Sequence, residues 1–170
     1  IRQMTNERGE STNALYGFIR SVQKVIKDFS PKHLIAVFDG PNNKKTRTDI
    51  YPDYKANRTG MPEDLLYQLD LAIKYCKYAG IPCLIEPNIE ADDLIGSITK
   101  WAEKQKTTVY ICSSDKDLCQ LISNHVFMIH THKENLVIDK ERVKTLYEVK
   151  PEQIVDYLAI MGDKSDNIPG

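Results

Sequence analysis

The chain has 170 residues, of which 41% are hydrophobic and 28% charged, and its formal net charge is -1. These values are ordinary for one globular domain with a sizeable core, and they exclude a largely disordered chain. No apolar run is long enough to span a membrane, and no basic and apolar leader opens the sequence. The four cysteines form no CxxC pair, which indicates reduced core thiols. We therefore expect a cytoplasmic protein without a membrane partner.

A long amphipathic helix comes first in the expected order of elements. Ser11 or Thr12 is expected to cap it, and apolar residues recur on one face until Pro31 ends the helix. The apolar run at 34–38 then predicts a strand buried on both faces. This strand delivers Asp39 directly at its C-terminal end.

Residues 41–60, called the basic segment below, carry a local excess of cations. The segment has no apolar periodicity, so we expect an exposed and mobile loop. A solvated loop explains such a charge run as well as a nucleic-acid site does. However, cations interleaved with aromatic residues also suit single-stranded nucleic acid, with its phosphates and base faces. The cations are Lys44, Lys45, Arg47, Lys55 and Arg58, and the aromatic residues are Tyr51 and Tyr54.

A second helix is expected from Pro62 to a stop at Gly80, and a short strand at 81–85 follows it. The predicted inward face of this second helix consists of Leu65, Leu66, Leu69, Ile73 and Cys76. The next helix begins at 90–93 with three acids in its first turn and continues with an inward pattern that includes Trp101. Acids at a helix start are ordinary, because they complement the helix dipole. Three neighbouring acids also repel one another, which favours a bound cation.

The rest of the chain continues the alternation of strands and helices. The further expected elements are strands at 107–112, 126–131 and 136–138, a turn at 133–135, and helices near 117–122, 143–147 and 151–161. Asp115 and Asp117 follow the first of these strands, and Asp163 and Asp166 follow the last helix.

This alternation predicts an α/β fold in which a mostly parallel, twisted sheet is covered by helices on both faces. Active sites of such folds gather beyond the carboxyl ends of the strands. Acids follow a strand end at three separate places, so we expect them to meet in one pocket. The predicted pocket is lined by Asp39, Glu90, Asp92, Asp93, Asp115 and Asp117, and closed by Asp163 and Asp166.

A set of eight carboxylates offers only oxygen ligands. Oxygen ligands select hard divalent cations such as Mg²⁺ or Mn²⁺ over zinc or copper. Eight acids are too many for one magnesium ion that keeps several waters, so two ions are expected. Two metal ions about 3.5 to 4 Å apart can support an in-line phosphoryl displacement. The basic segment would offset the repulsion between an acidic pocket and a phosphodiester.

The residues carry a family resemblance that covers nearly the whole chain. It rests on five motifs in the same order, at 37–40, 54–58, 90–93, 114–117 and 162–170. In these motifs the chain resembles the 5′ to 3′ exonuclease domain of bacterial DNA polymerase I and, more widely, the flap endonucleases. The resemblance implies a PIN-like or resolvase-like nuclease fold with two metal ions, in which the eight acids are the metal ligands.

The resemblance also implies a structure-specific 5′ nuclease of DNA replication and repair, which cuts flaps and RNA primers. Its partners would be DNA with 5′ flaps, nicks or RNA primers, and a covalently linked polymerase domain. The basic segment would form part of a helical arch, with Lys55 and Arg58 as catalytic residues at the scissile phosphate and Arg47 in support. Lys44, Lys45 and Tyr54 would contact nucleic acid as well. A monomer in the bacterial cytoplasm, associated with the nucleoid, is expected.

Under this resemblance, residues 1–149 form the nuclease core, including the basic segment. The N-terminal strand of the family, which ends in a further metal-binding aspartate, is expected to be missing before Ile1. Residues 150–170 are expected to begin a helix-hairpin-helix region that the chain does not complete.

Two other functions remain open at this point. A catalytically inactive nucleic-acid-binding fragment of the same fold could keep the basic segment, but it gains nothing from so many acids beside phosphates. An acidic buffer or sensor of divalent ions lacks the ligand spacing of an EF-hand and leaves the basic segment unexplained.

Overall fold

A computed structural model describes residues 4–131 and 136–170 of the chain. Its contacts divide the chain into two compact units. The first unit comprises Ile1–Phe38 and Thr59–Leu84, and the second comprises Asp39–Arg58 and Ile85–Gly170. All the acids and cations predicted for the site belong to the second unit. The turn expected at 133–135 lies outside the described residues.

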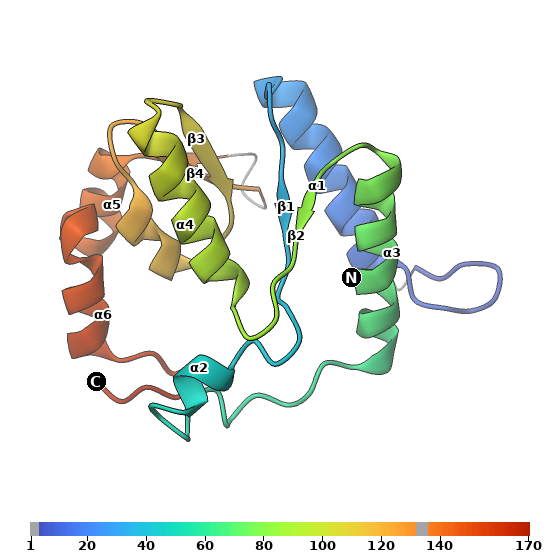
Figure 1. Cartoon of the computed structure of the whole chain (residues 1–170), viewed down its shortest axis with the longest axis horizontal. Coiled ribbons are helices and arrows are strands. Elements are labelled where there is room, and N and C mark those ends of the chain that lie inside the picture. The colour runs from blue at the N-terminus through green and yellow to red at the C-terminus, as the bar shows by residue number, and fades with distance from the viewer. Residues whose placement is uncertain (1–3, 132–135) are drawn as a thin grey trace. The chain divides into compact units, whose positions relative to one another are not determined.

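The first unit pairs two helices with a short parallel ladder (Figure 1). Its elements are α1 (Asn13–Phe29), β1 (Ala36–Val37), α3 (Glu63–Tyr78) and β2 (Cys83–Leu84). Strand β1 runs parallel to β2, with Ala36 opposite Cys83. The ring of Phe18 on α1 lies 6.4 Å from that of Tyr75 on α3, in an edge-on arrangement. Aromatic contacts of this kind join the two helices.

The N-terminus of α1 is capped by a residue from the other helix. Within the described residues the Thr12 side chain makes no capping hydrogen bond. Instead, Oε1 of Gln68 accepts hydrogen bonds from the backbone N–H groups of Ala14 and Leu15, at 2.9 and 3.2 Å. Gln68 is only 3% exposed. Thr12 is the N-cap residue, within the predicted choice of Ser11 or Thr12, but a tertiary contact rather than its side chain supplies the acceptor that the first turn needs.

The predicted inward face of α3 is also partly wrong. Leu65 and Leu66 are 36% and 48% exposed, whereas Gln68, Ala72 and Cys76 are buried. The polar Gln68 takes an inward position because its amide serves α1, and this rotates the buried face away from the two leucines. Cys76 is buried as predicted.

The second unit contains a three-stranded mixed sheet, in which β3 and β4 are parallel and β4 and β5 antiparallel. Helix α4 packs against β3, and the 3-10 helix η1 packs against β4 and α6. Buried residues of these elements form the core, with Val126, Ile129 and Val143 fully enclosed. The elements are α2 (Lys45–Thr48), α4 (Ala91–Lys104), β3 (Val109–Cys112), η1 (Lys116–Leu121), β4 (Val126–His130), β5 (Leu136–Ile138), α5 (Lys140–Tyr147), η2 (Pro151–Gln153) and α6 (Ile154–Met161).

The structure therefore has the predicted alternation of helices and strands, and its α/β class is confirmed. In the described part the strands form two small sheets rather than one central sheet, and their ladders are only two to four residues long. Trp101 is 66% exposed rather than inward, since Thr99 and Ala102 occupy the buried face of α4. Cys119 is buried as expected, but Cys112 is exposed at the end of β3.

A close backbone approach fixes the chain beside Asp39. A Cβ atom on Gly40 would lie 1.8 Å from the backbone oxygen of Glu86, so only glycine fits there. The N–H of Asn88 also donates to the carbonyl of Pro41 over 2.9 Å. These contacts hold residues 39–41 against the loop that leads into α4.

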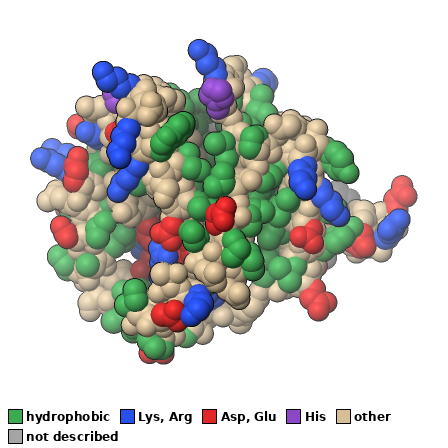
Figure 2. Space-filling model, in the orientation of Figure 1, with side chains coloured by type: hydrophobic (Ala, Val, Ile, Leu, Met, Phe, Trp, Pro, Cys, Tyr) green, Lys and Arg blue, Asp and Glu red, His purple; other side chains and the backbone are tan. Residues whose placement is uncertain are grey.

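Charged side chains of both signs are interspersed with hydrophobic ones on the face shown in Figure 2. Some large apolar residues are almost fully exposed, such as Tyr78 at 91% and Ile50 at 83%. Among the helices that the structure describes, none combines the length and the apolar character needed to cross a bilayer.

We predict that Gln68→Ala destabilises the fold, because it leaves the N–H groups of Ala14 and Leu15 without their acceptor. A buried donor without a partner costs about 1–3 kcal/mol. Urea titration should show this loss in the free energy of unfolding. Gln23→Ala, at an exposed position of α1, is the matched control and should change stability by less than about 0.5 kcal/mol. Equal effects of the two substitutions would contradict the capping role.

Candidate active site

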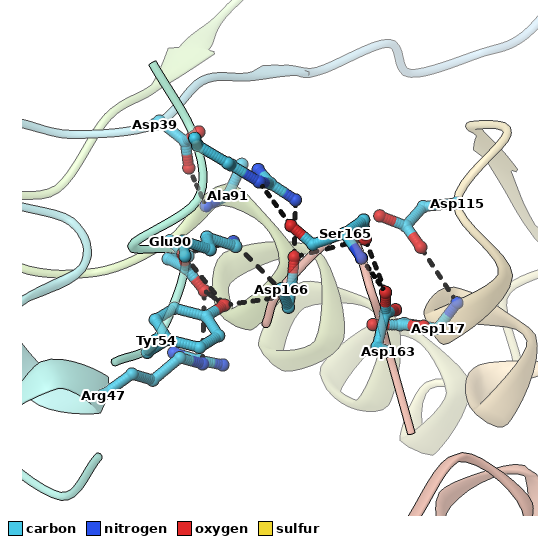
Figure 3. Close-up of polar contacts among 12 residues, drawn as sticks. Asp39, Arg47, Tyr54, Glu90, Ala91, Asp115, Asp117, Asp163, Ser165 and Asp166 are labelled. Atoms are coloured by element: carbon cyan, nitrogen blue, oxygen red, sulfur yellow. Dashed lines mark hydrogen bonds and ion pairs between the residues drawn. The ribbon is translucent and has the colours of Figure 1, made fainter. Parts of the chain in front are cut away.

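All eight predicted acids line one cavity of about 760 Å³ in the second unit. The prediction of a common pocket is therefore confirmed, and Figure 3 shows most of these acids with their polar contacts. Their role as metal ligands stays a prediction. The lining acids are Asp39, Glu90, Asp92, Asp93, Asp115, Asp117, Asp163 and Asp166.

Helix starts and tight turns position these carboxylates. Glu90 is the N-cap residue of α4, and Asp92 and Asp93 lie in its first turn. Oδ1 of Asp39 accepts a hydrogen bond from the N–H of Ala91 over 2.8 Å, so Asp39 satisfies a free donor of the same helix end. Asp115 caps η1 in a similar way, by accepting from the N–H of a residue in its first turn.

Arg47 is held by two acids of the cavity. Its guanidinium forms a two-pronged contact with Asp93, at 2.7 and 2.9 Å, and its Nε lies 3.2 Å from Glu90. Such a planar fork matches the geometry of a carboxylate. The hydrogen bond from Arg47 lowers the pKa of Asp93. The predicted nucleic-acid contact at Arg47 is thus occupied by acids of the chain itself.

Three further cations pair with cavity acids. Lys55 lies 2.7 Å from Glu90 and is only 11% exposed in its side chain, and Arg58 forms an ion pair with Asp166. Lys116 lies 3.1 Å from Asp163. Hydrogen bonds from Ser165, with help from Lys116, lower the pKa of Asp163 to about 2. Glu90, Asp93, Asp163 and Asp166 are called the paired acids below.

Tyr54 is buried beneath these ion pairs, at 9% exposure. Its hydroxyl lies 3.0 Å from Glu90 and 3.1 Å from Asp166, and it donates its proton to this pair of carboxylates (Figure 3). Burial and the two negative charges raise the pKa of Tyr54. Lys55 lies 4.7 Å from the centre of the Tyr54 ring, within the range of a cation–π contact.

Most of this part of the basic segment is exposed as expected, but Tyr54 is buried, Lys55 is half-buried, and the chain around them is attached to residues 163–167. The backbone N–H of Lys55 donates to the carbonyl of Asp166 over 2.9 Å, and the side chain of Asn57 donates to the carbonyl of Lys164. Arg58 contacts the same turn through the carbonyl of Ser165. The segment lacks an apolar pattern because polar and ionic contacts to residues 163–167, rather than a hydrophobic face, hold it in place.

The other four acids, Asp39, Asp92, Asp115 and Asp117, are called the open acids. Among the residues that the structure describes, none of them has an ion-pair partner. Burial and the charge of Asp115 raise the pKa of Asp92 and that of Asp117 to about 6. Oδ1 of Asp117 is buried and has no hydrogen-bond partner in the described part of the chain. Repulsion among the open acids is thus only partly offset, by the more distant charges of Lys55 and Lys116.

Within residues 4–131 and 136–170, no three His, Cys, Asp or Glu side chains are arranged so that they could hold a metal ion. The physical reason is visible in the ion pairs, since four of the eight acids point their oxygens at Lys or Arg. Carboxylates drawn toward cations of the chain do not converge on one point.

Of the predicted nucleic-acid contacts, Arg47, Tyr54, Lys55 and Arg58 line the cavity, and Lys44 and Lys45 do not. Lys45 pairs instead with Asp49 on the same helix, α2, over 2.8 Å. Sequence reasoning missed Lys116, Ser165 and Lys100, which also line the cavity. Lys116 and Ser165 each stand between two acids of a motif, so a signal was available for them. For Lys100, which lies on α4, the sequence offered none.

Asp92 and Asp93 are neighbours whose pKa values shift in opposite directions, which gives a prediction for the protein in EDTA. At pH 8, Asp92→Asn should raise the free energy of unfolding by about 1 kcal/mol after allowance for solvent screening. This gain should fade as the pH falls through 6 toward 4, because the native carboxyl then takes up a proton. Asp93→Asn should lower the free energy of unfolding at pH 8, because the ion pair of Asp93 with Arg47 is fully formed above the pKa of Asp93 in the unfolded chain. That contribution is lost only as the pH falls through the lowered pKa of Asp93 in the folded chain. Urea titrations at pH 8 and pH 5 measure both effects, and the same sign for both would refute the division into paired and open acids.

Comparison with known proteins identifies the family. Residues 1–148 match the family described as the 5′-3′ exonuclease, N-terminal resolvase-like domain. A 5′-3′ exonuclease of Aquifex aeolicus is 42% identical over 167 residues, which cover 98% of this chain and 57% of the relative. A thermostable DNA polymerase I of Thermus thermophilus is 38% identical over 170 residues, 100% of this chain and 20% of the relative. The structure of T5 5′-exonuclease with divalent metal ions (zinc) superposes with a TM-score of 0.79 at 25% identity, over 92% of this chain and 61% of that one. The chain spans under two thirds of the length of these relatives, and it belongs to the 5′-3′ exonuclease family through its N-terminal resolvase-like domain.

Proposed function

We propose that this chain is a divalent-metal-dependent 5′ nuclease that hydrolyses phosphodiester bonds of DNA, and of RNA primers, at 5′ ends and flaps. The observation that carries this proposal is the cavity that gathers eight carboxylates beside Arg47, Lys55 and Arg58. Carboxylates alone would repel a phosphodiester, and cations alone would bind it without cutting. Family membership and the exonuclease relatives support the same activity.

The residues of the cavity fit divalent metal ions. Their donors are all oxygen, which suits Mg²⁺ or Mn²⁺. The buried, unpartnered Oδ1 of Asp117 and the raised pKa values of Asp92 and Asp117 indicate negative charge that lacks a counter-ion. The T5 5′-exonuclease structure, which holds divalent metal ions, supports this assignment. We propose two ions held by the eight acids, whose side chains would turn toward the ions as these bind, since no three of the described acids already converge on one point.

When bound, such ions would activate the attacking water and offset charge on the leaving oxygen. The chain's own residues then have separate tasks. Lys55 and Arg58 would contact the scissile phosphate, where their charge matters most as negative charge builds up. Tyr54 would keep Lys55 in place through the contact between its ring and the ammonium group. Arg47 would bind the phosphate backbone next to the cut.

The proposed partner is DNA with 5′ flaps, nicks or RNA primers. DNA polymerase I relatives, such as that of Thermus thermophilus, support a covalently linked polymerase domain. We propose that the protein acts as a monomer in the cytoplasm, near the nucleoid. Cysteines that are free in the described structure suit a reducing compartment.

A second candidate is a nucleic-acid-binding fragment that does not cut. One observation favours it, namely that in the described residues no three acids are preorganised around a metal position. The two functions differ in whether metal produces cleavage, so a single assay separates them.

The test is cleavage of an end-labelled 5′-flap duplex by the 170-residue chain, with Mg²⁺ or with EDTA. We expect cleavage only with Mg²⁺, and a loss of at least about 100-fold in Asp115→Asn, since even residues that merely support metal ligands reach that loss. Flap binding by Asp115→Asn should be retained or tighter, because the substitution removes a charge that repels phosphate.

Asp156→Asn on the exposed side of α6 is the matched control and should cleave at the wild-type rate. The Aquifex aeolicus relative serves as the positive control for the substrate. Binding without cleavage by this chain, while that relative cuts, would establish the non-cutting alternative. Full activity of Asp115→Asn would remove the cavity from the mechanism.

A further inference from the structure

We infer that the basic segment and divalent metal ions compete for the same carboxylates, so that metal binding releases the cations that nucleic acid needs. This inference rests on the proposed metal-dependent function and adds a form of regulation to it. Metal and nucleic acid would then strengthen each other's binding, although they contact different residues.

The contacts of Arg47 carry the first step. Both oxygens of Asp93 receive hydrogen bonds from its guanidinium, at 2.7 and 2.9 Å, and Glu90 lies 3.2 Å from its Nε. A divalent ion that approaches these two carboxylates meets a fixed positive charge within contact distance. The ion can be coordinated by the oxygens of Asp93 and Glu90 that Arg47 now contacts only after Arg47 moves away.

Lys55 and Arg58 extend the competition to the other side of the cavity. Lys55 lies between Glu90, at 2.7 Å, and Asp166, at 3.7 Å, while Arg58 pairs with Asp166. The same two acids also accept from the Tyr54 hydroxyl. Arg47, Lys55 and Arg58 therefore occupy three of the paired acids, and Lys116 on η1 occupies the fourth.

Release has a structural consequence, because ionic contacts are much of what holds the segment. Apart from Tyr54, residues 50–58 present no buried hydrophobic side chain. Weakening the pairs with Glu90, Asp93 and Asp166 removes these ionic contacts and leaves hydrogen bonds, chiefly those of Tyr54 and those to residues 163–167, to hold the segment. Metal binding would thus free Arg47, Lys55 and Arg58 for phosphates.

Thermodynamic linkage makes the effect reciprocal. If metal raises the affinity for nucleic acid by some factor, nucleic acid raises the affinity for metal by the same factor. Phosphates that attract Arg47 and Lys55 away from Glu90 return that carboxylate to the metal. The alternative is that the cations are permanent anchors and that only the open acids bind metal. In that case the ion pairs of Arg47 and Arg58 would persist with metal bound, and trypsin would cut the segment no faster with Mn²⁺ than without it.

Arg47→Ala tests this inference through metal affinity rather than activity. The 170-residue chain is titrated with Mn²⁺ alone at low salt, and free Mn²⁺ is measured by electron paramagnetic resonance. Arg47→Ala should bind Mn²⁺ at least about 5-fold more tightly than wild type, the lower end of typical coupling between sites. Lys45→Ala is the matched control, because it removes the same charge from the same segment but its partner Asp49 lies outside the cavity. Its Mn²⁺ affinity should equal that of wild type.

Arg58→Ala is a second variant, at a more exposed ion pair, and it should also tighten Mn²⁺ binding. It provides the test in case Arg47→Ala fails to fold. In wild type, Mn²⁺ should also speed trypsin cleavage after Arg47 and Lys55, as the segment is released. Tight Mn²⁺ binding with equal affinity in wild type, Arg47→Ala and Arg58→Ala would overturn the competition and leave the proposed nuclease intact. No Mn²⁺ binding by any variant would overturn both.

Discussion

Mutual repulsion of eight carboxylates in one cavity is the constraint on which the second unit of this protein depends. For half of the acids, ion pairs with Lys or Arg side chains of the same chain offset this repulsion. The most buried of these cations is Lys55, whose side chain is 11% exposed. Isolated surface ion pairs contribute little to stability, but buried charges need partners. The basic segment is therefore folded onto the acids although it lacks a hydrophobic face. The open acids have no such partner among the described residues, and they are the place where a divalent ion would relieve most repulsion.

The position of the acids could be predicted from the sequence, because it follows from local structure. Asp39 ends a short apolar run, Glu90 caps a helix and Asp115 caps another, and each of these signals is contained in a few neighbouring residues. We expected one pocket because the carboxyl ends of parallel strands meet at one edge of a sheet. The acids do line one cavity of the second unit, although the described strands form two sheets. The five sequence motifs also predicted the protein family, and the match of residues 1–148 to the family domain confirms this prediction. Boundaries of helices such as α1 and α4 were predictable for the same reason.

The contacts that arise between distant segments were not predictable. Burial of Tyr54 depends on carboxylates of Glu90 and Asp166, which no local pattern connects to it. The basic segment looked like a solvated loop because periodicity detects hydrophobic packing and not ion pairs. Likewise, Gln68 was not among the residues of the predicted inward face, yet it is buried and supplies the acceptor for the first turn of α1. Gln68 lies on the face of α3 where the sequence pattern predicted leucines. Tyr54 is buried in a segment where the pattern predicted no buried residue.

Exchange of chain cations for metal ions is the central claim, and anomalous diffraction from crystals grown with Mn²⁺ tests it most directly. We expect an anomalous peak in the cavity, with carboxylate oxygens around it and the guanidinium of Arg47 separated from Asp93. Crystals of the same form grown in EDTA should keep the two-pronged contact between Arg47 and Asp93. An Mn²⁺ peak beside Asp93 with that contact unchanged, or the absence of any peak in the cavity, would contradict the account.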